Sequence, residues 1–185
     1  MIIIVVLPVF LSAQSLRLTR FAEEEGILWA ATDDGLVRFD GRDFRLFRDE
    51  LPGSYAKSVS VLPDGDLLAS SDMGISLIHE NSGIVTIKTI ARGSVRQSDT
   101  AMWFPKMIFT DSKGRVWLSD NFRAYRYNNG AFSSYNLGPD VSTNNFNRSF
   151  SFTEDGSGNL FAFSETGLVF IYDASSDSFK RLTLS

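Results

Sequence analysis

Cysteine is absent from the 185-residue sequence, and histidine occurs once, as His79. The absence of cysteine excludes disulfides, thiolate nucleophiles and Cys-ligated zinc, and a single histidine excludes a multi-histidine metal site. Basic residues are not in excess either, because 18 Lys and Arg stand against 22 Asp and Glu and the formal charge is -4. Nucleic-acid-binding proteins usually carry a basic excess. We therefore expect no metal, no cofactor and no nucleic-acid partner.

A long apolar run is also missing. The longest run, residues 2–11, is far shorter than the roughly 20 residues of a membrane-spanning helix, so we expect no membrane span in this chain. Small residues follow it up to Ala13, which predicts a secretory signal peptide over residues 1–13, although no Lys or Arg precedes the run. A buried first strand is the alternative, disfavoured by Pro8. The protein is accordingly expected in the periplasm or otherwise exported to a bacterial envelope.

Aromatic residues and glycine are abundant. The sequence has 16 Phe, 5 Tyr and 3 Trp together with 14 Gly. Aromatic side chains favour strands and glycines favour tight turns, so this composition indicates many short strands joined by turns.

Four units of the sequence resemble one another. Each contains an anchor glycine, and successive anchors lie about 40 to 50 residues apart, a period typical of repeat folds. The anchors are Gly26, Gly65, Gly114 and Gly158. Three residues after each anchor stands a large apolar residue. These are Trp29, Leu68, Trp117 and Phe161.

The units are predicted to be blades of a β-propeller. Apolar residues alternate with a period of two and Asp-Gly, Asn-Gly and Lys-Gly pairs punctuate the units, which disfavours a helical repeat of similar length. We expect an all-β fold of four four-stranded antiparallel blades belonging to a larger ring of about seven blades. A self-closed ring of four is the alternative. After residues 1–13, the propeller region covers 14–185, with blades at about 15–49, 55–90, 104–136 and 148–185.

The first unit carries a family resemblance. Its run GILWAATDDGLVRFDGRDF, from Gly26 to Phe44, resembles the two-component regulator propeller repeat. The resemblance extends over residues 16–184, closely in the first unit and partially in the others. It implies the periplasmic sensor region of a hybrid histidine kinase or related regulator. We expect this chain to be the N-terminal part of such a sensor, whose remaining blades and C-terminal output domains lie outside it.

The expected ligand site lies in the connections between blades, over residues 49–56, 91–105 and 138–148. Loops on a rigid scaffold commonly carry binding residues. Aromatic faces beside Asn and Arg donors suit an oligosaccharide. The candidate residues are Tyr55, Arg92, Arg96, Trp103, Phe104, Asn145, Phe146 and Arg148. For Trp103 and Phe104, packing between blades is the alternative.

A Ser or Thr followed by an acid recurs in every unit, as Thr32-Asp33, Ser71-Asp72, Ser119-Asp120 and Ser164-Glu165. Such pairs commonly cap turns through bonds to their own backbone. Binding of a cation at the channel mouth is the alternative.

A ligand-sensing function is favoured by these observations. The hypothesis is an exported propeller that recognises a carbohydrate and signals through domains outside this chain. The alternative is an accessory or scaffold propeller that binds protein partners in an envelope or secretion system. A propeller lyase is disfavoured, since no catalytic constellation stands out and we expect no enzyme activity.

Overall fold

The computed structural model describes residues 18–24, 26–94, 101–137, 150–164 and 166–183, and these residues form strands and no helix. Blade 1 consists of β1 (Leu18–Glu24), β2 (Ile27–Thr32), β3 (Gly35–Phe39) and β4 (Phe44–Phe47). Blade 2 consists of β5 (Ala56–Val61), β6 (Leu67–Ser71), β7 (Gly74–Asn81) and β8 (Ile84–Ser94), with β9 (Met102–Trp103) added to its sheet. Blade 3 consists of β10 (Ile108–Thr110), β11 (Val116–Ser119), β12 (Arg123–Asn128) and β13 (Ala131–Asn136). Blade 4 consists of β14 (Phe150–Glu154), β15 (Leu160–Ser164), β16 (Val169–Asp173) and β17 (Ser178–Leu182).

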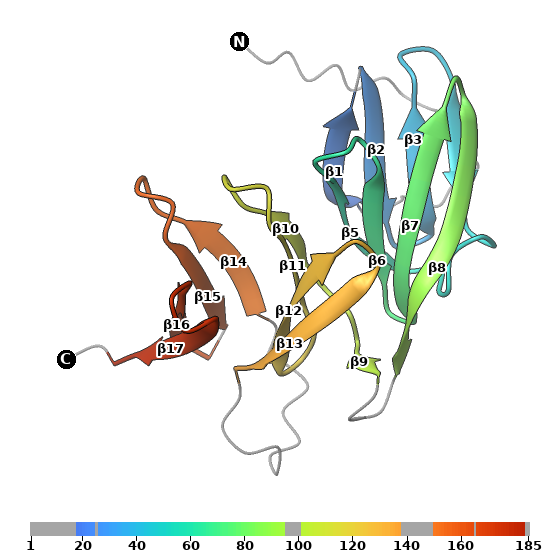
Figure 1. Cartoon of the computed structure of the whole chain (residues 1–185). Coiled ribbons are helices and arrows are strands. Elements are labelled where there is room, and N and C mark those ends of the chain that lie inside the picture. Colours follow the sequence, from blue (N-terminus) through green and yellow to red (C-terminus); the bar gives the residue numbers. More distant parts are fainter. Residues whose placement is uncertain (1–17, 25, 95–100, 138–149, 165, 184–185) are drawn as a thin grey trace.

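Each blade is an antiparallel meander, and the blades follow one another around an arc (Figure 1). The expected all-β fold of four-stranded blades is thereby confirmed, as part of a β-propeller. The turns of an antiparallel meander alternate between its two ends. We call the end that carries the first and third turns of each blade the turn end. The opposite end, which carries the second turn and the connections between blades, is the loop end.

The anchor glycines explain the repeat. Each lies in the first turn of its blade at positive φ, with values of 81°, 89°, 74° and 73° for Gly26, Gly65, Gly114 and Gly158. Residues with a side chain rarely adopt this conformation. The same turn chemistry therefore recurs in all four units.

Three hydrophobic clusters hold the blades together, one at each seam, the contact between two successive blades. Trp29 of blade 1 belongs to the cluster with Leu67 and Ala69 of blade 2. Leu68, on the other face of β6, belongs to the cluster with blade 3, and Trp117 belongs to the cluster with blade 4. The apolar residue after the anchor therefore faces the next blade, because alternate residues of a strand point to opposite faces.

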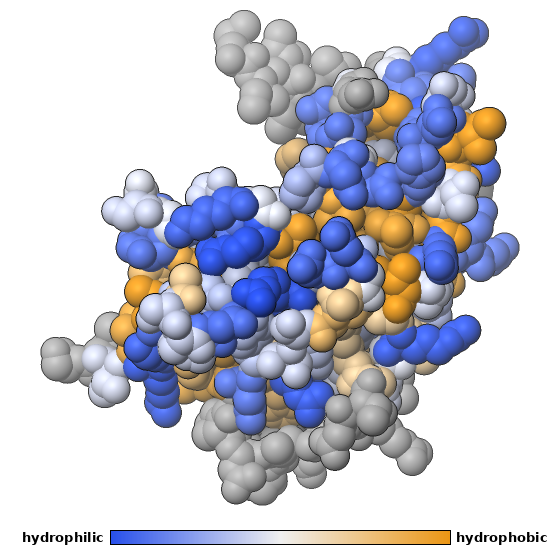
Figure 2. All heavy atoms as spheres, viewed as in Figure 1, coloured by the Kyte–Doolittle hydropathy of each residue, from blue (hydrophilic) through white to orange (hydrophobic). Residues whose placement is uncertain are grey.

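The outer faces of the two terminal blades stay uncovered by the described residues. Phe21, Phe44 and Leu46 are exposed on the face of blade 1 directed away from blade 2, and Phe163 and Leu182 on the corresponding face of blade 4. Figure 2 shows hydrophobic side chains at its left edge, over blade 4. No cluster of described residues combines blades 1 and 4. The alternative of a self-closed ring of four is therefore wrong for these residues.

The connection expected at residues 91–105 is partly strand, so that prediction is wrong at both ends. β8 continues to Ser94, and β9 returns to pair with it in parallel. A backbone hydrogen bond of 2.8 Å from Gly93 N to Met73 O fixes the end of β8. A Cβ at position 93 would lie 2.9 Å from the Met73 carbonyl carbon, so only glycine fits here.

Candidate ligand-binding site

A lysine between two aromatic rings lies at the loop end of blade 2. Lys57 Nζ is 5.8 Å from the ring centroid of Tyr55 and 5.2 Å from that of Phe104. Tyr55 directly precedes β5 and Phe104 directly follows β9, so two separate connections meet over this side chain. Both distances lie within the range of cation–π attraction. The structure therefore brings together two of the predicted residues, Tyr55 and Phe104, through Lys57.

The electrostatics of Lys57 are unusual for a lysine. Its pKa is lowered to about 8, chiefly by burial, while the carboxylate of Asp72 raises the pKa and the charge of Lys106 lowers it. Desolvation disfavours the charged form of a buried lysine. Lys57 therefore changes protonation state close to neutral pH, whereas an exposed lysine does not.

A carboxylate oxygen in the same region has no partner among the described residues. Asp72 Oδ1 is buried and accepts no hydrogen bond. A Cβ on Gly53 would lie 2.4 Å from this oxygen, so the glycine lets the first connection pass closely over it. Buried polar atoms are nearly always paired. An unpaired oxygen beside a desolvated lysine and two aromatic rings is an acceptor placed for a ligand hydroxyl or for water.

The backbone at Phe104 is strained. Its φ is 51°, in the left-handed region that residues with a side chain seldom adopt. A hydrogen bond of 3.1 Å from Phe104 N to Ser94 O holds the residue in place. Such strain is common at ligand-binding positions, and the Phe104 ring lies 5.2 Å from Lys57 Nζ.

Trp103 has a packing role in the structure. It is 8% exposed, and its ring stacks on Phe122 with 4.8 Å between centroids. Its backbone N–H donates to Asp120 Oδ2 at 3.0 Å. The other oxygen of Asp120 accepts from the backbone N–H of Phe122 and Arg123, at 2.8 and 2.7 Å. In this blade the Ser-acid pair therefore caps its turn, as the more common interpretation of such pairs predicts.

Arg92 lines a different cavity, of about 300 Å³, between β8 and the outer strands of blade 3. The lining includes a second arginine, Arg123, and the rings of Tyr125 and Phe132. Arg92 itself is exposed and belongs to β8, opposite Gly74 at the loop end. The structure thus places Arg92 at the predicted end of blade 2, beside a cavity with two guanidinium groups.

The remaining candidates, Arg96, Asn145, Phe146 and Arg148, lie outside the described residues. Sequence reasoning named Asp72 only within the recurring Ser-acid pair, as a turn cap with cation binding as the alternative, and it missed Asn121. Asn121 is 1% exposed, and neither its Oδ1 nor its Nδ2 has a hydrogen-bond partner. Asp72 is the acid of such a pair and Asn121 directly follows one, Ser119-Asp120, so that pair was the available signal.

Two further searches were negative within the described ranges. No group of three or more His, Asp or Glu side chains is arranged to hold a metal ion. No helix in that part of the chain is long and apolar enough to cross a membrane.

Solved structures with the same fold include sensor domains. The chain is similar to the extracellular domain of the one-component system BT4673 from B. thetaiotaomicron, with a TM-score of 0.68 and 19% identity over 89% of this chain and 22% of that one. The extracellular domain of the hybrid two-component system BT3049 from the same organism matches with a TM-score of 0.65 and 16% identity, over 90% and 23% of the two chains. The chain thus spans about a fifth of the length of these domains.

An enzyme shares the fold as well. Virginiamycin B lyase from Staphylococcus aureus matches with a TM-score of 0.67 and 11% identity, over 94% of this chain and 58% of the lyase. No family model matches the sequence, and no curated protein matches it either. At these identities the likeness establishes the fold. The chain is part of a β-propeller.

Proposed function

We propose that these four blades belong to the ligand-recognition region of an exported sensor of the two-component type, located in the periplasm or elsewhere in the bacterial envelope. The loop end of blades 2 and 3 binds a carbohydrate, and the signal passes to domains outside this chain. The blades themselves catalyse no reaction. Sensor domains among the structures of the same fold support this assignment.

The cluster at Lys57 is the observation that carries the proposal. The ring of Tyr55 is 43% exposed and offers a stacking face. Lys57 donates hydrogen bonds to ring or hydroxyl oxygens, and the unpaired Asp72 Oδ1 accepts from a hydroxyl. Sugars combine an apolar ring face with hydroxyl groups, so stacking plus directional polar contacts matches them. Arg92, Arg96, Trp103, Phe104, Asn145, Phe146 and Arg148 are proposed to line or support the same end.

Further blades complete the ring in this proposal. The uncovered apolar faces of blades 1 and 4 have the chemistry of the faces buried at the three seams. Four blades spread over 58% of the length of the lyase correspond to about seven blades in a full ring, within the range that closes.

The lyase-like alternative has weak support from the residues. The solved lyase is described as catalytically inactive when a histidine is replaced by alanine. The single histidine of this chain, His79, lies at the turn end of blade 2, where its Nδ1 pairs with Asp66 Oδ1 at 2.6 Å. It is therefore at the opposite end of the blade from the Lys57 cluster.

A panel of oligosaccharides titrated against the full chain tests the proposal. We expect binding that falls about tenfold or more in Lys57→Met and Tyr55→Ala, because each loses a polar or stacking contact. Lys88→Met is the matched control, since Lys88 is exposed on β8, and it should bind as the unmodified chain does. For an anionic oligosaccharide, affinity should fall as the pH rises through about 8, where Lys57 loses its charge.

Two results would reject the proposal. Equal losses in Lys57→Met and Lys88→Met would mean that the cluster has no particular role. Binding of an extended peptide, without any glycan, would favour the accessory or scaffold function.

A further inference from the structure

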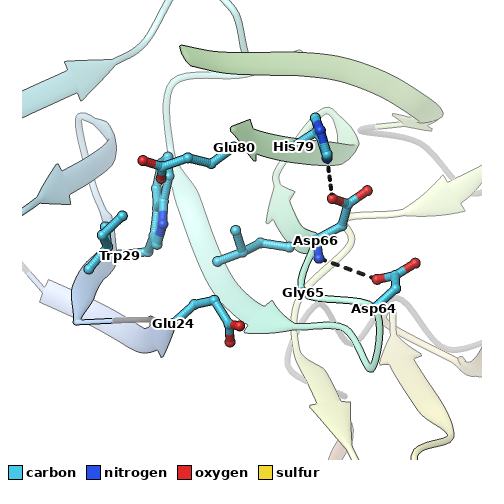
Figure 3. Close-up of a pocket in the computed structure, with 9 residues that line it drawn as sticks. Glu24, Trp29, Asp64, Gly65, Asp66, His79 and Glu80 are labelled. Carbon is cyan, nitrogen blue, oxygen red and sulfur yellow. Dashed lines mark hydrogen bonds and ion pairs between the residues drawn. The ribbon is translucent and has the colours of Figure 1, made fainter. Parts of the chain in front are cut away.

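A second cavity lies at the turn end of the seam between blades 1 and 2. Its volume is about 170 Å³, and both blades line it (Figure 3). Pockets for drug-sized ligands usually measure about 300 to 1,000 Å³, so this cavity suits a ligand of about one ring. It is remote from the Lys57 cluster, because the two lie at opposite ends of blade 2.

Acidic side chains surround the cavity. The four are Glu24, Asp64, Asp66 and Glu80. Only two have a basic partner: Glu80 accepts from Arg38 at 2.6 Å, and Asp66 pairs with His79. The Glu24 carboxylate has no hydrogen-bond or ion-pair partner within the described ranges, although it lies close to Gly65 of blade 2. The acidic side chains around the cavity therefore outnumber their basic partners.

The indole N–H of Trp29, in the cavity wall, is also unused. Trp29 lines the cavity and is 1% exposed, yet its indole N–H donates to no atom of the described residues. The equivalent side chain of blade 3, Trp117, donates its indole N–H to Asp111 Oδ2 at 2.9 Å. Buried indole N–H groups usually find an acceptor. At Trp29 that acceptor has to come from a ligand or from water.

From these groups we propose that the cavity binds a small hydroxylated amine of the amino-sugar class. The carboxylates of Glu24 and Asp64 have no basic partner among the described residues, although Asp64 accepts from the backbone N–H of Asp66, and they favour an ammonium group. An ammonium group cannot accept a hydrogen bond, so it does not pair with the Trp29 N–H. A hydroxyl or ring oxygen on the same ligand would accept that hydrogen bond. A bare metal ion is not the expected occupant, since no group of the described acids has ligand geometry for one.

Like charges at a seam are unfavourable for folding, which supports a binding role. Uncompensated acids repel one another and weaken the contact that holds two blades together. Departures from well-matched packing are expected at functional sites. A cationic ligand removes this repulsion on binding.

Glucosamine is the probe for the test, with glucose and N-acetylglucosamine as neutral analogues of the same ring. We expect glucosamine to bind the full chain at low ionic strength, and both neutral sugars to bind at least about tenfold more weakly. Glu24→Gln should lower glucosamine affinity about tenfold, and Trp29→Phe should lower it by a smaller factor. Asp49→Asn is the control, because Asp49 is an exposed acid away from the cavity and the net charge changes equally.

A melting curve separates binding from folding. Glu24→Gln should melt at the same temperature as the unmodified chain or higher, since it removes one repelling charge, while it loses glucosamine. The loss of glucosamine affinity caused by Glu24→Gln should be the same when Lys57 is also replaced by methionine, which keeps this site distinct from the loop-end site. No binding of glucosamine, equal binding of glucose, or equal losses in Glu24→Gln and Asp49→Asn would overturn the proposal.

Discussion

The seam between blades 1 and 2 and the seam between blades 3 and 4 start from the same pair of residues. Trp29 pairs with Arg38 across β2 and β3, and Trp117 pairs with Arg126 across β11 and β12. Each tryptophan is at most 1% exposed, and each arginine reaches across its seam to an acid of the next blade. The two seams differ in what surrounds this common pair.

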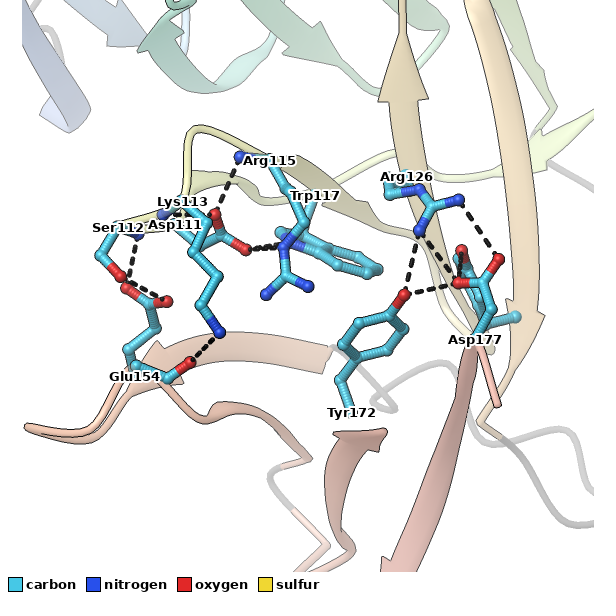
Figure 4. A network of polar contacts seen from close by, with 11 residues as sticks. Asp111, Ser112, Lys113, Arg115, Trp117, Arg126, Glu154, Tyr172 and Asp177 are labelled. Carbon is cyan, nitrogen blue, oxygen red and sulfur yellow. Dashed lines mark hydrogen bonds and ion pairs between the residues drawn. The ribbon is translucent and has the colours of Figure 1, made fainter. Parts of the chain in front are cut away.

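At the seam between blades 3 and 4 the polar groups are paired (Figure 4). Asp111 accepts from Trp117 Nε1 and from Arg115 Nε, at 2.9 and 2.5 Å. Glu154 of blade 4 accepts from the backbone N–H and the hydroxyl of Ser112, at 2.7 and 3.1 Å. The corresponding place at the other seam holds a cavity with an unpaired acid, Glu24.

Aromatic filling differs in the same way. Tyr172 and Phe179 of blade 4 lie edge-on against Trp117, with centroids 4.7 and 5.6 Å away. Trp29 stacks on Phe47 of its own blade, at 5.6 Å. One seam is therefore closed by the next blade and the other leaves room for a ligand. The repeated Trp-Arg pair is thus common to both seams, whereas the residues around it determine whether the seam is packed or contains a cavity.

Replacing Asp111 with alanine should have the largest effect on the comparison. The side chain is fully buried, and its loss leaves Arg115 and the Trp117 N–H without their acceptor. We expect a loss of about 3 kcal/mol in the free energy of unfolding, measured by urea denaturation. Asp155→Ala is the control, since Asp155 caps the equivalent turn of blade 4 in an exposed position, and its loss of stability should be clearly smaller. Equal losses would show that burial of the acid does not matter.

Arg38→Gln should have the next largest effect. Here the seam between blades 1 and 2 should lose more stability than the seam between blades 3 and 4 loses in the equivalent variant. Arg38 and Glu80 have side chains that are each 12% exposed, so the change leaves Glu80 among other acids without its cation. We expect a loss of about 2 kcal/mol. Arg126→Gln removes a more exposed pair with Asp177, and should cost at most about 1 kcal/mol in the same denaturation assay. A larger loss for Arg126→Gln would contradict our view of the charges at the two seams.

Replacing each tryptophan with phenylalanine should again affect the stability of the two seams differently. Both changes remove the same volume, but only Trp117→Phe leaves a buried acceptor on Asp111 without its donor. We expect Trp117→Phe to cost about 1 kcal/mol more than Trp29→Phe. Denaturation curves of the two variants measure this difference. If the Trp29 variant were the less stable one, its indole N–H would have an acceptor that we have not identified.

The sequence predicts much of this architecture, because turn glycines and alternating apolar residues are local signals. Gly65 and Trp117 could be assigned from spacing alone. The candidate site depends on contacts between separate connections, which the spacing of residues in the sequence does not predict. Phe104 reaches Lys57 from the next connection, and Gly53 of another connection lies close to the unpaired Asp72 Oδ1. Arg38 and Arg126 share an offset from their anchor glycines, but their acidic partners stand at different offsets. Those partners could be identified only from the contacts between blades in the structure.

Acid should weaken the seam between blades 3 and 4 through Asp177, the smallest effect we expect. Hydrogen bonds from the hydroxyls of Tyr172 and Tyr135, followed by the charge of Arg126, lower the pKa of Asp177. A carboxyl with a lowered pKa adds stability above its unfolded pKa, near 3.8, and loses it as the pH falls through the folded value. Unfolding free energies between pH 6 and pH 3 should therefore fall less steeply in Asp177→Asn.

Asp40, beside the other seam, is the matched control for that measurement. Its pKa is lowered to about 2, chiefly by the backbone N–H of Asp43 and then by Arg38, so its main partner lies within its own turn. Asp40→Asn should also flatten the pH dependence. Only the effect of Asp177→Asn should become smaller when Tyr135 of blade 3 is already replaced by phenylalanine, because that tyrosine donates to Asp177 across the seam at 2.8 Å while Tyr172 of blade 4 still donates to it. An unchanged effect in the double variant would mean that Asp177 acts within blade 4 alone.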